Sequence, residues 1–120
     1  MTVRVAVGRK TFMCRHITSL LLLAKGQRFS RQLQQGCGLF MDFGREKRVV
    51  LDMLFVFYPL DIVWIGTNQK VVAVCQHVRP FVPSLQGPPA RFVLELRTGE
   101  AEGIRIGDRV TSKLLKKDIS

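Results

Sequence analysis

The sequence predicts a mainly β (α+β) fold, in which one compact barrel-like or sandwich-like domain carries one or two short helices near residues 18–35. Three observations predict it. Short β-branched and aromatic runs alternate with turns rich in glycine and proline. Val3, Val5 and Val7 alternate with more polar residues, which is typical of a half-buried strand. Finally, 120 residues suffice for one domain with a real core, but are too few for two.

The individual elements follow from local signals. Thr18 or Ser19 is a plausible N-cap for a helix that Gly26 ends, and Ser30 can cap a second short helix that Gly36 ends. The predicted helices cover residues 20–24 and 31–35. The predicted strands cover residues 3–7, 12–16, 39–41, 49–57, 62–65, 71–78 and 91–96, and a closing segment covers residues 104–110.

The apolar middle of the chain predicts the centre of the sheet. Residues 49–57 are β-branched and aromatic, so we expect a central strand covered on both faces, which Pro59 interrupts. Residues 79–91 hold four of the five prolines and predict an irregular surface loop. The domain is expected to span residues 1–110, and residues 111–120 to form a frayed basic tail.

The charge is strongly positive and uneven. The chain carries 19 Lys and Arg against nine Asp and Glu, a net charge of +10, and residues 1–48 alone carry +8. This excess favours an anionic partner such as nucleic acid, another polyanion or an acidic membrane surface. No aromatic-basic alternation, helix-turn-helix or finger spacing accompanies it. The candidate anion-binding residues are Arg4, Arg9, Lys10, Arg15, Arg28, Arg31, Arg45, Lys47 and Arg48, with Lys113, Lys116 and Lys117 as a further group.

Cysteine usage and hydropathy bear on the compartment. Cys14, Cys37 and Cys75 cannot all pair within one chain, which favours a reducing cytoplasm over a disulfide-bonded secreted protein. Residues 17–24 superficially resemble a signal peptide, but this apolar run is short and is preceded by sixteen residues. Residues 49–65 contain two aspartates and a proline, so we interpret them as core and predict no transmembrane segment.

A doubled Cys-x-His pattern offers a possible metal site. Residues two apart in a strand point to the same face, so Cys14 with His16 and Cys75 with His77 could converge on one tetrahedral metal if their strands were neighbours. The alternative is that all four are ordinary core or rim residues. No other pattern in the chain suggests a cofactor, and no P-loop or dinucleotide-binding glycine motif is present.

Two aspartates stand in structured surroundings. Asp61 lies inside an apolar segment, so its carboxylate should be buried and should bond to backbone N–H groups of a neighbouring turn. A binding or catalytic role is the alternative for Asp61. Asp108, between Gly107 and Arg109, is most simply an Asx-type turn residue.

The order of motifs resembles the bacterial and archaeal family known as domain of unknown function 192. The motifs are Gly38-Leu39-Phe40, Pro59-Leu60-Asp61-Ile62-Val63, Lys70-Val71-Val72, Arg91-Phe92-Val93-Leu94-Glu95 and Gly103-Ile104-Arg105-Ile106-Gly107-Asp108-Arg109-Val110. The resemblance covers roughly residues 36–111. It implies a compact, mainly β fold with a short helix and implies no activity. A stretch that often reads Trp-Met-Lys-Asn-Thr in the family is Asp52-Met53-Leu54-Phe55-Val56 here.

The first functional hypothesis is a small non-enzymatic binding or accessory module. The turns of the family motif suggest a ligand site at a rim formed by Asp61, Arg79 and Asp108. The alternatives are an anion- or nucleic-acid-binding protein that uses the basic residues above, and a metal-binding protein that uses the two Cys-x-His pairs. An enzyme stays open as a further hypothesis, because small β barrels host varied sites.

Overall fold

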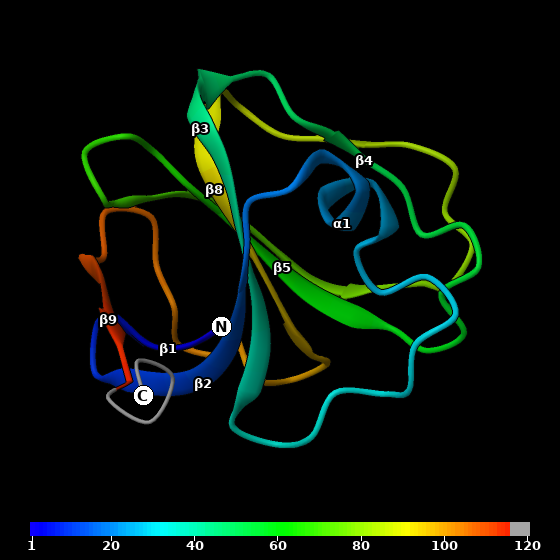
Figure 1. The fold of residues 1–120 in the computed structure, drawn as a ribbon, viewed down its shortest axis with the longest axis horizontal. Helices are drawn as coiled ribbons and strands as arrows, with labels where there is room; N and C mark the ends of the chain where they lie inside the picture. The colour runs from blue at the N-terminus through cyan, green and yellow to red at the C-terminus, as the bar shows by residue number, and fades with distance from the viewer. Residues whose placement is uncertain (116–120) are drawn as a thin grey trace.

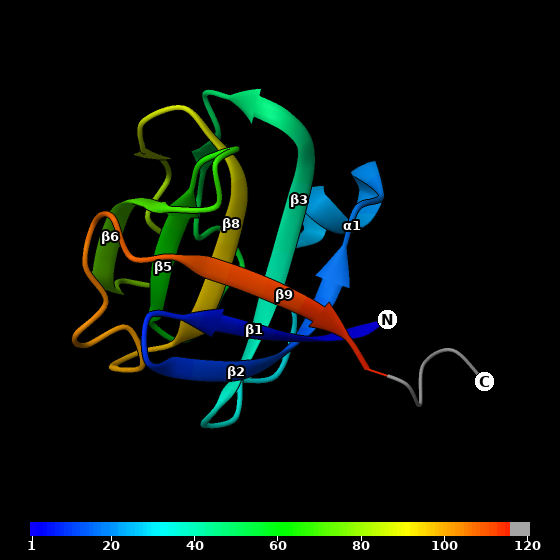
Figure 2. The same ribbon diagram turned by 90° about the vertical axis from the view of Figure 1, so that its left-hand side faces the viewer.

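Seven strands form one mixed sheet that folds over on itself (Figures 1 and 2). The computed structural model describes residues 1–115. Its strands are β1 (Thr2–Val7), β2 (Lys10–Ile17), β3 (Cys37–Lys47), β4 (Val50–Leu51), β5 (Leu60–Ile65), β6 (Val71–Val78), β7 (Leu85–Gln86), β8 (Ala90–Arg97) and β9 (Val110–Leu114), and its helix is α1 (Leu20–Lys25). The large sheet has the order β6-β5-β8-β3-β2-β1-β9, and β4 pairs with β7. The mainly β, barrel-like or sandwich-like prediction is therefore confirmed.

The mixed character comes from one parallel pair. β2 and β3 run parallel, because the chain returns through α1 and a long connection, whereas every other neighbouring pair is antiparallel. Gly38 lies where β3 passes between its neighbours. A Cβ there would be 2.8 Å from Leu96 Cδ2 and 3.0 Å from the Glu95 carbonyl oxygen, so a side chain at this position would force its neighbours to shift.

Two cores lie on opposite faces of the sheet. Figure 2 shows β9, β1 and β2 crossing in front of β3, β8 and β5. Val3, Val5 and Phe12 pack against Leu94 and Leu96 inside this fold. The second core covers the other face of β3, β8 and β5, where the buried side chains are Ile17, Leu39, Met41, Val49, Met53, Val56, Leu60, Ile62, Trp64, Val78, Ala90 and Val93.

The sheet nearly closes at the starts of its two edge strands. Lys70 and Arg109 form an isolated antiparallel bridge, and the backbone of Val71 bonds to Asp108 and to Gly107. These bonds hold the end of the predicted 104–110 segment against β6 without forming a complete ladder.

The predicted central strand over residues 49–57 is wrong. Only Val50–Leu51 forms a strand, because Met53 bonds through its N–H and its carbonyl to the loop at residues 81 and 82. Phe55 then takes a φ of 60°, which ends any extended run. The segment has three buried residues, Val49, Met53 and Val56, which cover the second core from outside any long strand. The strands covered on both faces are instead β5, in which all six residues are buried, and β8.

Two smaller predictions also fail. Residues 31–35 form no helix, and this connection reaches β3 in irregular conformation through Gly36 at a φ of 79°. Residues 111–114 belong to β9, which pairs with β1, so they are not a frayed tail. Residues 116–120 of the expected tail lie outside the described residues. Within residues 1–115, no helix is long and apolar enough to cross a bilayer.

Asp61 ties β5 to two other segments. Its side chain is fully buried. Oδ1 accepts a hydrogen bond from the His77 backbone N–H and Oδ2 accepts one from the Ala101 backbone N–H, each at 2.8 Å. The expectation that backbone N–H groups satisfy this carboxylate is confirmed, and the two bonds fix β6 and the turn after β8 against β5.

We expect Asp61→Asn to destabilise the protein by about 2–4 kcal/mol, measured by urea unfolding. The amide has one acceptor oxygen, so one of the two buried N–H groups would face an NH₂ group. Asp42→Asn is the matched control. Asp42 pairs with Arg91 at a partly exposed site, so this substitution should cost about 1 kcal/mol or less. Equal losses in the two variants would contradict the role assigned to Asp61.

Candidate functional site

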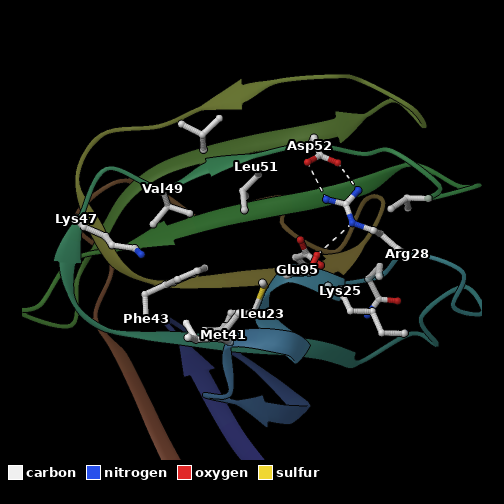
Figure 3. Close-up of a pocket in the computed structure, with 16 residues that line it drawn as sticks. Leu23, Lys25, Arg28, Met41, Phe43, Lys47, Val49, Leu51, Asp52 and Glu95 are labelled. Atoms are coloured by element: carbon white, nitrogen blue, oxygen red, sulfur yellow. Dashed lines mark hydrogen bonds and ion pairs between the residues drawn. The ribbon is translucent and has the colours of Figure 1, made fainter.

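A pocket of about 260 Å³ opens between α1, the 49–56 segment and the sheet (Figure 3). This volume is close to the lower end of the ~300–1,000 Å³ range of small-molecule sites. Its apolar walls are Leu20, Leu23, Met41, Phe43, Val49, Leu51 and Val56, and its polar lining includes Lys25, Arg28, Lys47, Asp52 and Glu95. The pocket thus combines apolar walls with a few charged groups, as ligand sites do.

Helix α1 forms one wall without being packed into a core. Ser19 caps it by accepting a hydrogen bond from the Leu22 N–H at 3.2 Å, and Gly26 ends it at a φ of 50°. No residue of the helix is buried. Leu23 is the residue of α1 that packs against the second core, whereas Leu20 and Leu21 are exposed. The predicted cap and the predicted glycine stop are therefore confirmed.

Glu95 lies at the sheet side of the pocket. It stands on β8, directly opposite Leu39 of β3 and Ile62 of β5, so its neighbours in the sheet are apolar. The side chain is 6% exposed, and its Oε1 atom has no hydrogen-bond partner within the described residues. Such an atom is costly unless something pairs with it.

Burial raises the pKa of Glu95 from its ordinary 4.5 to about 7. The nearby Arg28 guanidinium opposes this rise and the Asp52 carboxylate adds to it, but desolvation is the largest cause. Near neutral pH the pocket therefore presents a carboxyl group that is partly protonated and partly charged. Carboxyl groups with such raised pKa values concentrate at functional sites.

Arg28 and Asp52 form the rim above Glu95. The two side chains pair through both Nη atoms of Arg28, and the Nη2–Oδ2 distance is 2.8 Å. Arg28 also donates from Nη1 to the Leu54 carbonyl at 2.8 Å and from Nε to the Ala24 carbonyl at 3.1 Å. Hydrogen bonding to Arg28 lowers the pKa of Asp52. This pair therefore fastens the 52–54 loop to the end of α1 and holds the pocket open.

The predicted rim of Asp61, Arg79 and Asp108 does not form. Arg79 follows the last residue of β6, whereas Asp108 bonds to Val71 at its first residue. An eight-residue strand spans about 23 Å at about 3.3 Å per residue, so the two lie far apart. Asp108 accepts a bond from the Arg105 N–H at 2.9 Å, which agrees with its expected turn role. Asp61 is enclosed by its two backbone partners.

The two Cys-x-His pairs do not meet either. Cys14 and His16 lie on β2 and Cys75 and His77 on β6, and three strands separate β2 from β6 in the sheet. Cys14 is buried in the core inside the fold, whereas Cys75 packs against the second core. The His16 ring lies beside that of Phe40 in a tilted arrangement, with the centroids 5.7 Å apart. Among residues 1–115, no three Cys, His, Asp or Glu side chains are grouped to hold a metal, so the predicted four-ligand site is wrong.

The basic residues do not share one face. Arg4 is paired directly with Lys113 across β1 and β9, and Arg15 lies on the same outer face of β2. Arg9 and Lys10 lie beside Arg105 at the turn between β1 and β2. The remaining candidates divide between the pocket (Arg28 and Lys47), a neighbouring hollow (Arg31) and the exposed end of β3 (Arg45 and Arg48). Lys116 and Lys117 lie outside the described residues.

Sequence reasoning named Arg28 and Lys47 as anion-binding candidates but missed the pocket that they line with Glu95. Glu95 is a charged residue between Leu94 and Leu96 in a predicted strand, and that mismatch was the available signal. Arg28 and Asp52 are 24 positions apart, and no local pattern connects them. Their pairing depends on the 52–58 segment being a loop.

The comparisons with known proteins identify the family and no function. The sequence pattern of the DUF192 family, described as an uncharacterized ACR, matches residues 3–112. The chain therefore belongs to this family of uncharacterised proteins. The match confirms the resemblance and extends it from residues 36–111 to the N-terminal strands β1 and β2. A search of curated proteins finds no match to this chain.

Solved structures share the fold. A candidate transcription regulator from Sinorhizobium meliloti 1021 superimposes with a TM-score of 0.84 at 22% identity, covering 92% of each chain. A protein of unknown function from Novosphingobium aromaticivorans has a TM-score of 0.84 at 26% identity, covering 92% of this chain and 84% of its own. No activity follows from either structure.

Glu95→Gln tests the buried carboxyl. Glu95 has a pKa near 4.5 in the unfolded chain and near 7 in the folded protein. The free energy of unfolding is therefore highest below pH 4.5, and it falls as the pH rises from 4.5 through 7. Glutamine cannot ionise. We expect the variant and the wild type to unfold alike at pH 4.5, and the variant to be more stable by about 3 kcal/mol at pH 8. Urea unfolding across this range measures the difference, and a difference that does not change with pH contradicts the account.

Proposed function

We propose that this protein is a binding module whose pocket takes a small amphipathic molecule with an apolar body and an N–H or O–H donor. The observation that supports it most is Glu95, a buried carboxyl whose Oε1 has no partner within residues 1–115 and which lines an otherwise largely apolar pocket. A ligand donor would satisfy that oxygen. The walls would bury the rest of the ligand.

The pocket also limits the size of the ligand. Its 260 Å³ is roughly nine times the ~30 Å³ share of one liquid water molecule, which leaves room for roughly ten non-hydrogen atoms. Lys25, Arg28 and Lys47 outnumber Asp52 and Glu95 in the lining. A primary amide or an alcohol suits this setting, because it donates to Glu95 without bringing a further positive charge.

Hexanamide tests this proposal as a simple probe. At pH 7 we expect it to shift the backbone amide NMR signals of Gly26, Met41 and Glu95, with a Kd on the order of 1 mM. N,N-dimethylhexanamide keeps the apolar chain but has no N–H donor, so it should bind at least tenfold more weakly.

Two variants locate the binding. Leu23→Trp places a larger side chain in the pocket wall and should abolish the shifts, whereas Ile106→Ala changes an exposed side chain outside the pocket and should leave them unchanged. Equal binding of the two amides, or binding that survives Leu23→Trp, would contradict the proposal.

A second candidate function is anion binding by the outer face of β9, β1 and β2. Arg4, Arg15 and Lys113 support it, because they share this face and no described carboxylate pairs with any of them. Such a surface would bind nucleic acid without regard to sequence. Its strength would depend on salt.

Salt titration of a fluorescent 20-nucleotide DNA tests the second candidate. Removing Arg4, Arg15 and Lys113 together as alanines should lower the slope of log K against log salt by about 2–3. The matched control replaces Arg45, Arg48 and Arg105 with alanine, which removes the same charge from other sites. This control should lower the slope by less. If the affinity of the wild type for this DNA does not change with salt below 200 mM, anion binding by this face is excluded.

We further propose a cytoplasmic location. Its support is that Cys14, Cys37 and Cys75 are all free thiols, which suits a reducing compartment.

A further inference from the structure

Four exposed phenylalanines form a closed cluster at one end of the molecule. Phe29, Phe55, Phe57 and Phe81 are each between 43% and 70% exposed. Each ring contacts two others, with centroid distances of 4.8 Å for Phe29–Phe55, 6.0 Å for Phe55–Phe81, 5.2 Å for Phe57–Phe81 and 6.5 Å for Phe29–Phe57. A contiguous apolar patch of this kind on a charged protein marks an interaction surface.

Three separate loops build this aromatic cluster. Residues 25–33, 52–58 and 79–84 come together on the right-hand side of Figure 1. The Phe29 N–H donates to the Phe55 carbonyl at 2.9 Å, and the Phe81 N–H donates to the Met53 carbonyl at 2.8 Å. The loops therefore hold the rings in place through their backbones. The four rings therefore form one ordered surface and are not isolated exposed side chains.

The backbone under the cluster is strained. Phe29, Phe55 and Phe81 have φ values of 56°, 60° and 63°, a conformation that bulky residues rarely adopt. Strain of this kind persists where the surrounding structure enforces it, and it concentrates at functional sites. Here the left-handed backbone directs three large apolar side chains toward solvent, where they gain no stability from burial.

The loops that carry the cluster are basic. They contain Lys25, Arg31 and Arg79 in addition to Arg28, which is already paired with their one acidic residue, Asp52. We infer that the aromatic cluster inserts into the surface of an anionic lipid bilayer while Lys25, Arg31 and Arg79 contact the headgroups. Aromatic side chains surrounded by Lys and Arg are the usual composition of a peripheral membrane anchor.

Charge and ring geometry favour a bilayer over the other occupants. A second copy of this chain would bring another net charge of +10 against the same basic loops, which repels. Single-stranded nucleic acid would need open ring faces for stacking, but Phe29 and Phe55 already stack on each other at an interplanar angle of 20°. Insertion into an apolar lipid phase requires no free ring face and no rearrangement of the cluster.

Flotation with lipid vesicles tests the inference. In 100 mM NaCl the protein should float with vesicles of 70% phosphatidylcholine and 30% phosphatidylglycerol, and float at least tenfold less with phosphatidylcholine alone. The variant Phe29→Asn with Phe57→Ser should reduce binding to the anionic vesicles at least tenfold, since asparagine tolerates the φ of residue 29. Arg31→Glu with Arg79→Glu should also reduce it at least tenfold.

Controls separate the cluster from general effects. Ile106→Asn removes an equally exposed apolar side chain at the other end of the molecule and should bind like the wild type. Phe57→Ser alone, at a residue whose φ is not left-handed, should lose at least threefold and serves if the double variant does not fold. Absence of flotation overturns the inference, and so does flotation that the Phe substitutions leave unchanged. Self-association or DNA binding that the same Phe substitutions abolish, without vesicle binding, overturns it as well.

Discussion

The constraint on which the structure depends is that β8 is covered on both faces. One face of β8 packs into the core inside the folded sheet through Phe92, Leu94 and Leu96. The other face carries Val93 and Glu95 toward the second core. Because side chains alternate along a strand, Glu95 has no route to open solvent that keeps its neighbours buried. A carboxyl group held there needs either a proton or a partner.

The rest of the site is arranged around that carboxyl group. The parallel return from β2 to β3 brings α1 over this face of the sheet, and the Arg28–Asp52 pair fastens the loop after β4 to the helix end. These elements surround the pocket without filling it. The same loop then turns its phenylalanines outward beside basic residues. One irregular segment, residues 52–58, therefore supplies both a wall of the pocket and part of the aromatic cluster.

The sequence predicted what depends on local pattern. Alternation located β1, and apolar runs between turns located β6 and β8. The Ser19 cap and Gly26 bounded α1, and an aspartate in an apolar segment correctly implied buried backbone partners. The strand predicted over residues 49–57 was wrong because composition does not distinguish a buried strand from an apolar loop that covers a core. The pocket could not be predicted from the sequence, because Arg28, Asp52 and Glu95 come together only when β3, β5 and β8 have paired. The Cys-x-His hypothesis failed for the same reason, because strand order decides which pairs meet.

The central claim is that Glu95 is a buried carboxyl with a free oxygen at a ligand pocket. Its titration, followed through the side-chain carboxyl ¹³C signal by NMR, tests this most directly. We expect an apparent pKa near 7 for Glu95 in the free protein. Saturating hexanamide should lower that pKa measurably, because its N–H group donates to the carboxylate. A pKa near the ordinary 4.5, unchanged by hexanamide, would contradict this claim.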